Sequence, residues 1–247
     1  MKIHFSIKKI ALGLIIICAM SLLGGVVVLG YYGFVPVVSD LFGSNKPIDL
    51  GVSFNDTNTQ DAIKKTGINF EYIQPTDKPE ESLKFSGETA INTSFTSNEL
   101  SALIANDKWK YNFLKNTQIK INDDGTSEIS TGINTELLGG FAAAHGIEED
   151  QIKPLIDQLK MANSPPVYIK LAASWSNNSL KMDIQKIEIG RYLMDRDWID
   201  KNESTITSQI ENSILRTPGV SITSLTFLNG EMQYNGTLPD KIQWAIN

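Results

Sequence analysis

The feature that most constrains this chain is a long uncharged run close to its N-terminus. Residues 10–38 contain no Asp, Glu, Lys or Arg, and apolar residues continue through Val28 and Leu29. A helix over residues 10–35, with its rise of about 1.5 Å per residue, is longer than the roughly 30 Å hydrocarbon core of a bilayer. A cleaved signal peptide has an apolar region of only about 7–15 residues. We therefore predict an uncleaved transmembrane anchor over residues 10–38.

The charges beside this run predict its orientation. Lys2, Lys8 and Lys9 precede it, and positive charges favour the cytoplasmic side of a membrane. We therefore predict a cytoplasmic tail over residues 1–9, in a single-pass protein of the cell membrane whose C-terminal part lies outside the cytoplasm. Turn-forming residues predict a linker over residues 39–47, and residues 48–247 are then the extracytoplasmic domain.

Aromatic residues mark the outer end of the predicted anchor. Tyr31 and Tyr32 lie where an aromatic belt at the membrane–water interface is expected. Pro36 follows them, and proline is poorly tolerated inside a helix. We therefore expect the helix to end close to Pro36.

Charge and cysteine content exclude several kinds of partner. Without the three N-terminal lysines the chain has 19 Lys and Arg against 28 Asp and Glu, a net charge of −9. Phosphate binding needs a basic face, so we expect no nucleic acid partner. The only cysteine, Cys18, lies in the apolar run, which excludes intramolecular disulfides and cysteine-based zinc sites. We expect no metal site and no cofactor.

Alternating apolar and polar residues predict antiparallel sheet in the outer part of the chain. One long strand is predicted over residues 83–95, with a wet face and an apolar face. Three hairpins are predicted, with turns at residues 123–125, 177–178 and 229–230. The apolar phase shifts after Gln185, which predicts a β-bulge at Gln185 and Lys186.

Helices are predicted between these hairpins. Thr96 and Glu99 form a capping box that opens one helix. Apolar residues at helical spacing predict two more, and these residues are Ile152, Leu155, Ile156 and Leu159 in the first and Ile199, Ile206, Ile210 and Ile214 in the second. The fold class is therefore α+β, with a mostly antiparallel sheet packed against helices. Residues 96–132 and 199–236 both follow the order helix, strand, turn, strand, which favours two diverged repeats.

These patterns resemble a known class of protein. The residues that carry the resemblance are the anchor, the helix start Thr96-Ser97-Asn98-Glu99-Leu100 and the segments TQIKINDDGTSEISTGI and LTFLNGEMQYNGTLP. Together they look like bacterial single-pass envelope proteins of unknown function, whose outer domains are similar to lipoprotein-type folds. The resemblance covers residues 42–239 and implies a curved antiparallel sheet that wraps helices. Some relatives of that architecture bind lipids, but no functional residue carries over.

Motifs for catalysis are absent from the sequence, and we expect no enzyme and no catalytic residue. There is no G-x-S-x-G, H-E-x-x-H, Walker or G-x-G-x-x-G pattern. His145 is the only histidine in the predicted outer domain that could belong to a Ser-His-Asp arrangement, because His4 lies in the predicted tail. His145 follows three alanines and precedes Gly146, which is typical of a helix C-terminus.

Two other patterns have simpler structural explanations. Lys65-Thr66-Gly67 matches the K-T-G of penicillin-binding enzymes, but no S-x-x-K nucleophile lies on the same side of the membrane, so Gly67 is expected to cap a helix. Asp195, Asp197 and Asp200 lack the glycine turn of a calcium-binding EF-hand. We expect these acidic residues to stabilise the start of a helix.

The sequence leaves three functional hypotheses. The first is a non-enzymatic, membrane-anchored domain that binds a lipid or another apolar ligand between its sheet and two helices. The residues expected to face that ligand are Ile152, Leu155, Ile156, Leu159, Ile206, Ile210 and Ile214. A closed core would explain the same residues. The second is an envelope protein–protein interaction or structural module that binds a partner protein through sheet edges or helices. The third, a hydrolase, lacks a usable His-Ser-acid set.

Overall fold

A computed structural model describes residues 20–148, 150, 153, 156–157 and 164–246. Ile152, Leu155 and Leu159, three of the expected ligand-facing residues, lie outside the described residues. Ile156 is described as helical and half-buried.

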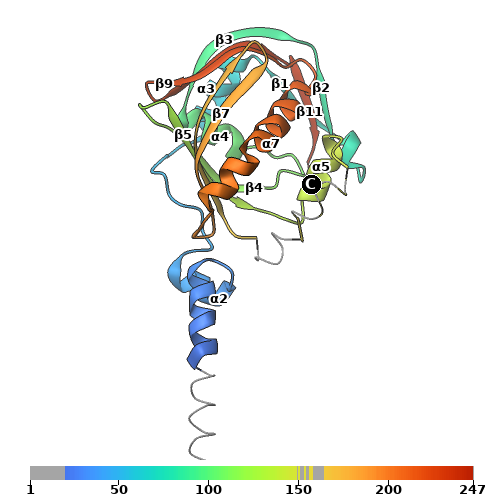
Figure 1. The fold of residues 1–247 in the computed structure, drawn as a ribbon. Helices are drawn as coiled ribbons and strands as arrows, with labels where there is room; N and C mark the ends of the chain where they lie inside the picture. The colour runs from blue at the N-terminus through green and yellow to red at the C-terminus, as the bar shows by residue number, and fades with distance from the viewer. Residues whose placement is uncertain (1–19, 149, 151–152, 154–155, 158–163, 247) are drawn as a thin grey trace, which may run out of the picture.

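A curled antiparallel sheet forms most of the domain (Figure 1). Alternating residues along its strands place one set of side chains inside, as the sequence predicts. The strands in spatial order are β3 (Thr89–Thr96), β10 (Glu231–Leu238), β9 (Ser221–Leu228), β6 (Val167–Ser176), β5 (Thr126–Ile133) and β4 (Leu114–Ile121), with β7 (Ser179–Ile189) on β6 and β8 (Tyr192–Leu193) on β7. The α+β class with a mostly antiparallel sheet is therefore confirmed.

A second, smaller sheet lies beside the first and was not expected. Its order is β1 (Asn69–Ile73), β11 (Lys241–Ala245) and β2 (Leu83–Ser86). β1 and β11 are parallel, whereas β11 and β2 are antiparallel. The prediction of one strand over residues 83–95 is wrong, because the chain breaks at Gly87. This glycine has φ +73°, a left-handed conformation that ends the strand and sends β2 and β3 into different sheets.

The three predicted hairpins are confirmed as β4–β5, β6–β7 and β9–β10. In the last, Asn229 (φ 53°) and Gly230 (φ 76°) both have positive φ, as a two-residue type I′ turn requires. The bulge is confirmed as well, because Lys170 pairs with Lys186 while Leu171 pairs with Ile184, which leaves Gln185 unpaired.

Beyond residue 48, four helices with fully described bounds and one short 3₁₀ turn accompany these strands in the part of the chain that the structure describes. They are α3 (Asp56–Thr66), η1 (Pro79–Glu81), α4 (Ser97–Ala105), α5 (Leu138–Ala144) and α7 (Arg196–Leu215). The Thr96–Glu99 capping box is confirmed at the start of α4. α7 begins at Arg196, earlier than the apolar pattern indicates, because the Asp195 side chain accepts a hydrogen bond from the Asp197 N–H (2.8 Å) and caps the helix.

Helix α4 covers the free edge of β4. The Ile119 N–H donates to Ser101 Oγ (2.8 Å), and the Ser101 hydroxyl donates to the Ile119 carbonyl (3.2 Å). Ser101 is fully buried. One serine therefore supplies both hydrogen bonds that a neighbouring strand would otherwise make at this residue.

Helix α7 covers the free edge of β7 by the same means. The Ile184 N–H donates to the Glu203 carboxylate (2.5 Å), and the Leu180 N–H donates to the Glu211 carboxylate (2.6 Å). At β4 and β7, side chains from a helix thus bind backbone groups that would otherwise be free to pair with another strand.

The order α4, β4, β5 recurs as α7, β9, β10, as the sequence pattern suggests. A common origin for the two segments stays a prediction.

The N-terminal segment differs from the single helix that the sequence predicts. In the part of the chain that the structure describes, no single helix is long and apolar enough to cross a membrane. The helix Met20–Tyr31 and α2 (Pro36–Phe42) meet that criterion only together, and a bend of 62° separates them. Pro36 does not end a helix as expected. It lies in the first turn of α2, where its missing N–H has no helical partner to lose.

Candidate functional site

A cavity of about 690 Å³ lies between the small sheet and helices α3 and α4, and it is lined mainly by apolar and aromatic residues. It also extends to the loop over residues 106–114 and to α5. This region occupies the side of the domain on which β1, β2, β11 and α5 are labelled in Figure 1.

One face of the small sheet forms the floor of this cavity. Strand side chains alternate between faces, so every second residue points to the same side. The register places three residues side by side in each of two rows across the sheet. The first row consists of Phe70, Ile242 and Phe85. The second row consists of Tyr72, Trp244 and Leu83. All six residues line the cavity.

The opposite face of the small sheet is polar. Lys241 Nζ lies 3.0 Å from the Glu71 carboxylate, and the Gln243 side-chain amide donates to the same carboxylate (2.9 Å). The hydrogen bond from Lys241 holds the pKa of Glu71 below its ordinary value, and the bond from Gln243 adds to this effect. The sheet therefore has one wet face and one apolar face, and the apolar face meets the cavity.

Helix α3 provides the opposite wall. Asp56, Thr59, Gln60 and Ile63 line the cavity, and their spacing of three, four and seven residues places them on one face of the helix. Leu103 and Ile104, at the C-terminal end of α4, continue this wall.

Aromatic rings close one end of the cavity. Phe141 of α5 lies 4.6 Å from Phe113 and 5.9 Å from Trp109 between ring centroids. The Trp109 indole N–H donates to Ser82 Oγ (3.1 Å), which fixes the ring. The Lys110 N–H donates to the Ala245 carbonyl (3.0 Å), so the loop that carries Trp109 is attached to β11.

Besides the polar residues of α3, the side chains of His145, Asp107 and Trp244 bring polar groups to the cavity wall. His145 ends α5, as expected, and its Nδ1 lies 2.9 Å from the Phe141 carbonyl. Because a carbonyl only accepts, Nδ1 carries the hydrogen. Burial raises the pKa of Asp107 above its ordinary value, although the Trp109 N–H, which donates to its carboxylate (2.9 Å), acts in the opposite direction. The Trp244 indole N–H is buried and has no hydrogen-bond partner in the described part of the chain.

The residues predicted to face a ligand do not line this cavity where they are described. Ile206 packs against a buried cluster of Ile184, Ile187 and Ile199. Ile214 packs against a second cluster, around Phe95 and Trp175. Ile210 is 38% exposed, and Ile156 is half-buried and also absent from the lining. Their role in ligand binding stays a prediction, and the structure offers a different cavity.

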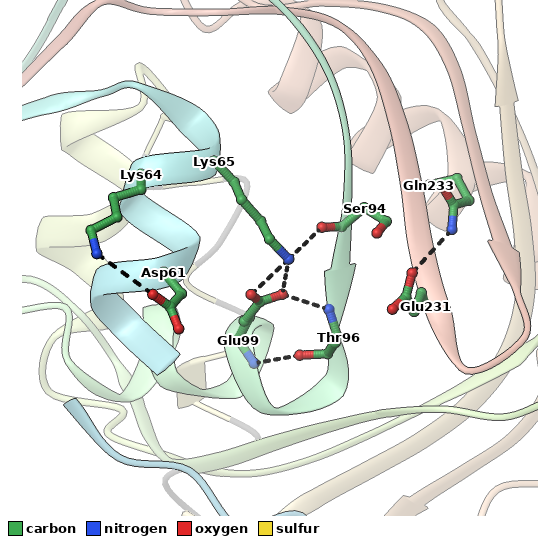
Figure 2. Close-up of polar contacts among 8 residues, drawn as sticks. All are labelled: Asp61, Lys64, Lys65, Ser94, Thr96, Glu99, Glu231 and Gln233. Carbon is green, nitrogen blue, oxygen red and sulfur yellow. Dashed lines mark hydrogen bonds and ion pairs between the residues drawn. The ribbon is translucent and has the colours of Figure 1, made fainter. Parts of the chain in front are cut away.

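The chemically suggestive motifs have structural roles. Gly67 caps α3 with φ 67°, as expected, and Lys65 forms an ion pair with Glu99 (2.7 Å) that joins α3 to α4 (Figure 2). Arg196 lies within the acidic group at the start of α7 and pairs with Asp200 (2.6 Å). No group of three or more His, Cys, Asp or Glu suited to a metal ion occurs among the residues that the structure describes.

Comparisons of this chain with protein-family models, with curated proteins and with solved structures found no match. The site is therefore interpreted from its own geometry and chemistry.

Proposed function

We propose that the chain is a membrane-anchored, extracytoplasmic binding protein that holds an apolar ligand in the cavity between the small sheet and α3. The observation that carries this proposal is the 690 Å³ cavity with its aromatic lining. Pockets for small ligands fall in the range of about 300–1,000 Å³ and combine apolar walls with a few polar groups.

The wall of the cavity has features that a closed core lacks. Tyr72 is 59% exposed, and Phe70, Phe85 and Phe113 are only half-buried, so much aromatic surface is left uncovered. The unpaired Trp244 N–H leaves a donor that a ligand oxygen would satisfy. Asp107, with its raised pKa, is the kind of perturbed acid that gathers at functional sites. These features favour a long or planar apolar body that carries a polar group.

The anchoring part of the proposal rests on the sequence. Residues 10–38 carry no charge, and lysines precede them on the side expected to be cytoplasmic. In the described part of this run, Leu22 and Leu23 expose two thirds or more of their surface, as residues covered by lipid do.

The alternative, an envelope interaction module that adds a partner strand to a sheet edge, has less support. Such pairing needs an open row of N–H and C=O groups. At Ile119 of β4 and at Leu180 and Ile184 of β7 such groups are bound by side chains of α4 and α7, and β3 is a further edge strand of the sheet.

The test is to fill the cavity. Ile63 lines it from α3, and Ile63→Trp adds a ring to open space, so the fold should keep its thermal midpoint within about 2 °C. Native mass spectrometry of the full chain in detergent, with an added C18 alcohol as the probe, should show a probe adduct for the parent protein and at least a tenfold weaker one for Ile63→Trp.

The matched control is Ile206→Trp on α7. Ile206 packs against a buried cluster, so the larger ring overpacks the core and is expected to cost about 1–3 kcal/mol. Probe binding by the fraction that remains folded should be unchanged. Loss of probe binding in Ile206→Trp but not in Ile63→Trp would show that the ligand binds at α7 and not in this cavity. The absence of any probe adduct in the parent protein would contradict the proposal.

A further inference from the structure

The segment that joins the apolar helix to the domain is folded into a compact neck, here defined as residues 30–44. The Ser44 hydroxyl donates to the Gly30 carbonyl (2.7 Å), and both Ser39 and Ser44 are almost completely buried. Val38 of α2 lies directly against Gly30, where any side chain on residue 30 would overlap it. The neck, which includes the first part of the predicted linker over residues 39–47, is therefore a packed structure.

A turn from the far part of the chain docks on this neck. The Arg191 N–H, between β7 and β8, donates to the Tyr32 carbonyl (3.2 Å), and the Arg191 guanidinium donates to the Gly43 carbonyl (3.3 Å). Gly190 has φ +66°, and a Cβ there would overlap the Tyr32 carbonyl. Only glycine lets the two backbones approach this closely.

The contact between neck and turn leaves a continuous apolar surface uncovered. Aromatic rings run across it, with centroid distances of 5.8 Å from Phe42 to Tyr31, 5.4 Å from Tyr31 to Tyr32 and 5.8 Å from Tyr32 to Tyr192. Several apolar side chains around these rings are highly exposed, including Leu41 at 83% and Leu193 at 56%. We call the exposed set the collar, and it consists of Tyr31, Val37, Leu41, Phe42, Tyr192 and Leu193.

We propose that the collar is a membrane-seating surface that lies in the headgroup region of the bilayer and holds the outer domain at a fixed orientation. Lipid is the expected occupant because the collar is continuous with the uncharged run of residues 10–38, whose C-terminal end contributes Tyr31 and Val37 to it. Tyrosine is also enriched at membrane–water interfaces, where its ring meets acyl chains and its hydroxyl meets water. In Figure 1 the neck forms the base of the domain, between the apolar helix and the sheet.

This inference deepens the proposed function, because it rests on the proposed anchor. It adds that β8, about 150 residues after the anchor in sequence, shares in membrane contact. A domain held at the base by both the anchor and β8 cannot rotate freely about a linker. The orientation of the aromatic cavity relative to the lipid surface is then set by the neck.

The test compares how close two residues of the full chain lie to the lipid headgroups, one in the collar and one at the β9–β10 hairpin. Cys18 is the only cysteine, so a Cys18→Ser background accepts single labels. Leu193→Cys probes the collar, and Leu228→Cys is its matched control, because Leu228 is equally exposed (54%) but lies at the β9–β10 hairpin, far from α2 in Figure 1. Each variant carries an environment-sensitive fluorophore and is reconstituted in phosphatidylcholine vesicles that contain a headgroup spin label.

We expect the lipid spin label to quench the fluorophore at residue 193 at least threefold more strongly than the fluorophore at residue 228. Gly190→Val, added to the Leu193→Cys variant, should remove this difference while the domain remains folded, because it separates the turn from the neck.

Equal, weak quenching at both residues in protein that stays with the vesicles would overturn the proposal that the collar contacts the membrane and would leave the anchor intact. Recovery of the protein away from the vesicles would instead contradict the anchor. Protection of residue 193 from both lipid and aqueous quenchers would point to a second copy of the chain and would also overturn the inference.

Discussion

At the scale of single residues, one buried carboxylate joins three elements of the fold. Glu99 is 6% exposed, accepts a hydrogen bond from the Thr96 N–H at the start of α4 and pairs with Lys65 of α3 (Figure 2). The Lys65 ammonium also donates to the Ser94 carbonyl of β3 (2.9 Å). Burial opposes the ionisation of Glu99, but the hydrogen bonds from Lys65 and Thr96 outweigh it and hold the pKa of Glu99 below its ordinary value of 4.5.

Replacing this carboxylate should destabilise the domain in a pH-dependent way. Glu99→Gln leaves Lys65 without its counter-ion and is expected to cost about 1–3 kcal/mol at pH 7, less than a fully buried pair because Lys65 is one-third exposed. Because the folded pKa lies below 4.5, the contribution of Glu99 is fully present above that pH and is lost as the pH falls through the folded value. Urea unfolding of both proteins at pH 7 and below pH 4 measures this difference.

The neighbouring pair Lys64–Asp61 is the control for that experiment. Its atoms are 3.7 Å apart and its side chains are 75% and 48% exposed (Figure 2). Exposed pairs contribute about 0–1 kcal/mol, so Asp61→Asn should change stability by no more than about 0.5 kcal/mol. Equal effects from the two substitutions would show that the buried pair has no special role.

A second carboxylate, Asp107 at the cavity, should have the opposite effect. Burial raises its pKa above the ordinary value of 3.8, so the stability of the folded state falls as the pH rises from 3.8 through the folded value, and the full cost is present above that value. Asp107→Asn keeps an oxygen for the Trp109 N–H and should therefore raise the urea midpoint at pH 7. The gain should shrink as the pH falls through the folded value and disappear below pH 3.8, where Asp107 is protonated in both states. A lower midpoint at pH 7 would show that the ionised form is stabilised by a group not identified here.

At the scale of secondary-structure elements, two edge strands of the main sheet, β4 and β7, are covered in the same manner. An exposed strand edge is open to pairing with other chains. In this domain α4 lies along β4 and α7 along β7, and their serine and glutamate side chains bind free backbone groups of these strands. A helix in each case replaces the missing strand, so the sheet can end without leaving its buried edge unsatisfied.

Removing one of these side chains should lower the free energy of unfolding, because backbone groups at the strand edge lose their hydrogen-bond partner. Ser101→Ala leaves both the N–H and the carbonyl of Ile119 without their partner in a buried site, which is expected to cost about 1–3 kcal/mol. Ser204→Ala, at an exposed position on α7, is the control and should change stability by no more than about 0.5 kcal/mol. Thermal unfolding of the full chain checks both values. A similar midpoint for Ser101→Ala and the parent protein would show that water reaches the edge of β4.

At the scale of the whole molecule, local patterns and long-range packing determined different features. The three hairpins, the bulge at Gln185 and the Thr96–Glu99 cap follow from the sequence, because each depends on residues that lie close together in the chain. The same local rules failed over residues 83–95, where the alternation continues across Gly87 although the chain changes sheets there.

The cavity could not be found in this way. Its floor needs β1 to pair with β11, and about 170 residues separate these strands. Each strand has only five residues, and so short an alternation is common in loops as well as in strands. The apolar residues of α7 are conspicuous in the sequence, and Ile206 and Ile214 pack into buried clusters, whereas the aromatic residues that line the cavity are scattered along the chain.

The sequence by itself therefore determined the α+β class, the hairpin turns, the helix caps and the long uncharged run, because these depend on dihedral preferences and periodicity within a few residues. Only the tertiary structure decided that residues 69–73 and 241–245 form one floor, that α4 and α7 cover the edges of β4 and β7, and that the β7–β8 turn docks on the neck. Those features depend on contacts between distant segments, which fold together only when the whole domain buries its apolar surface.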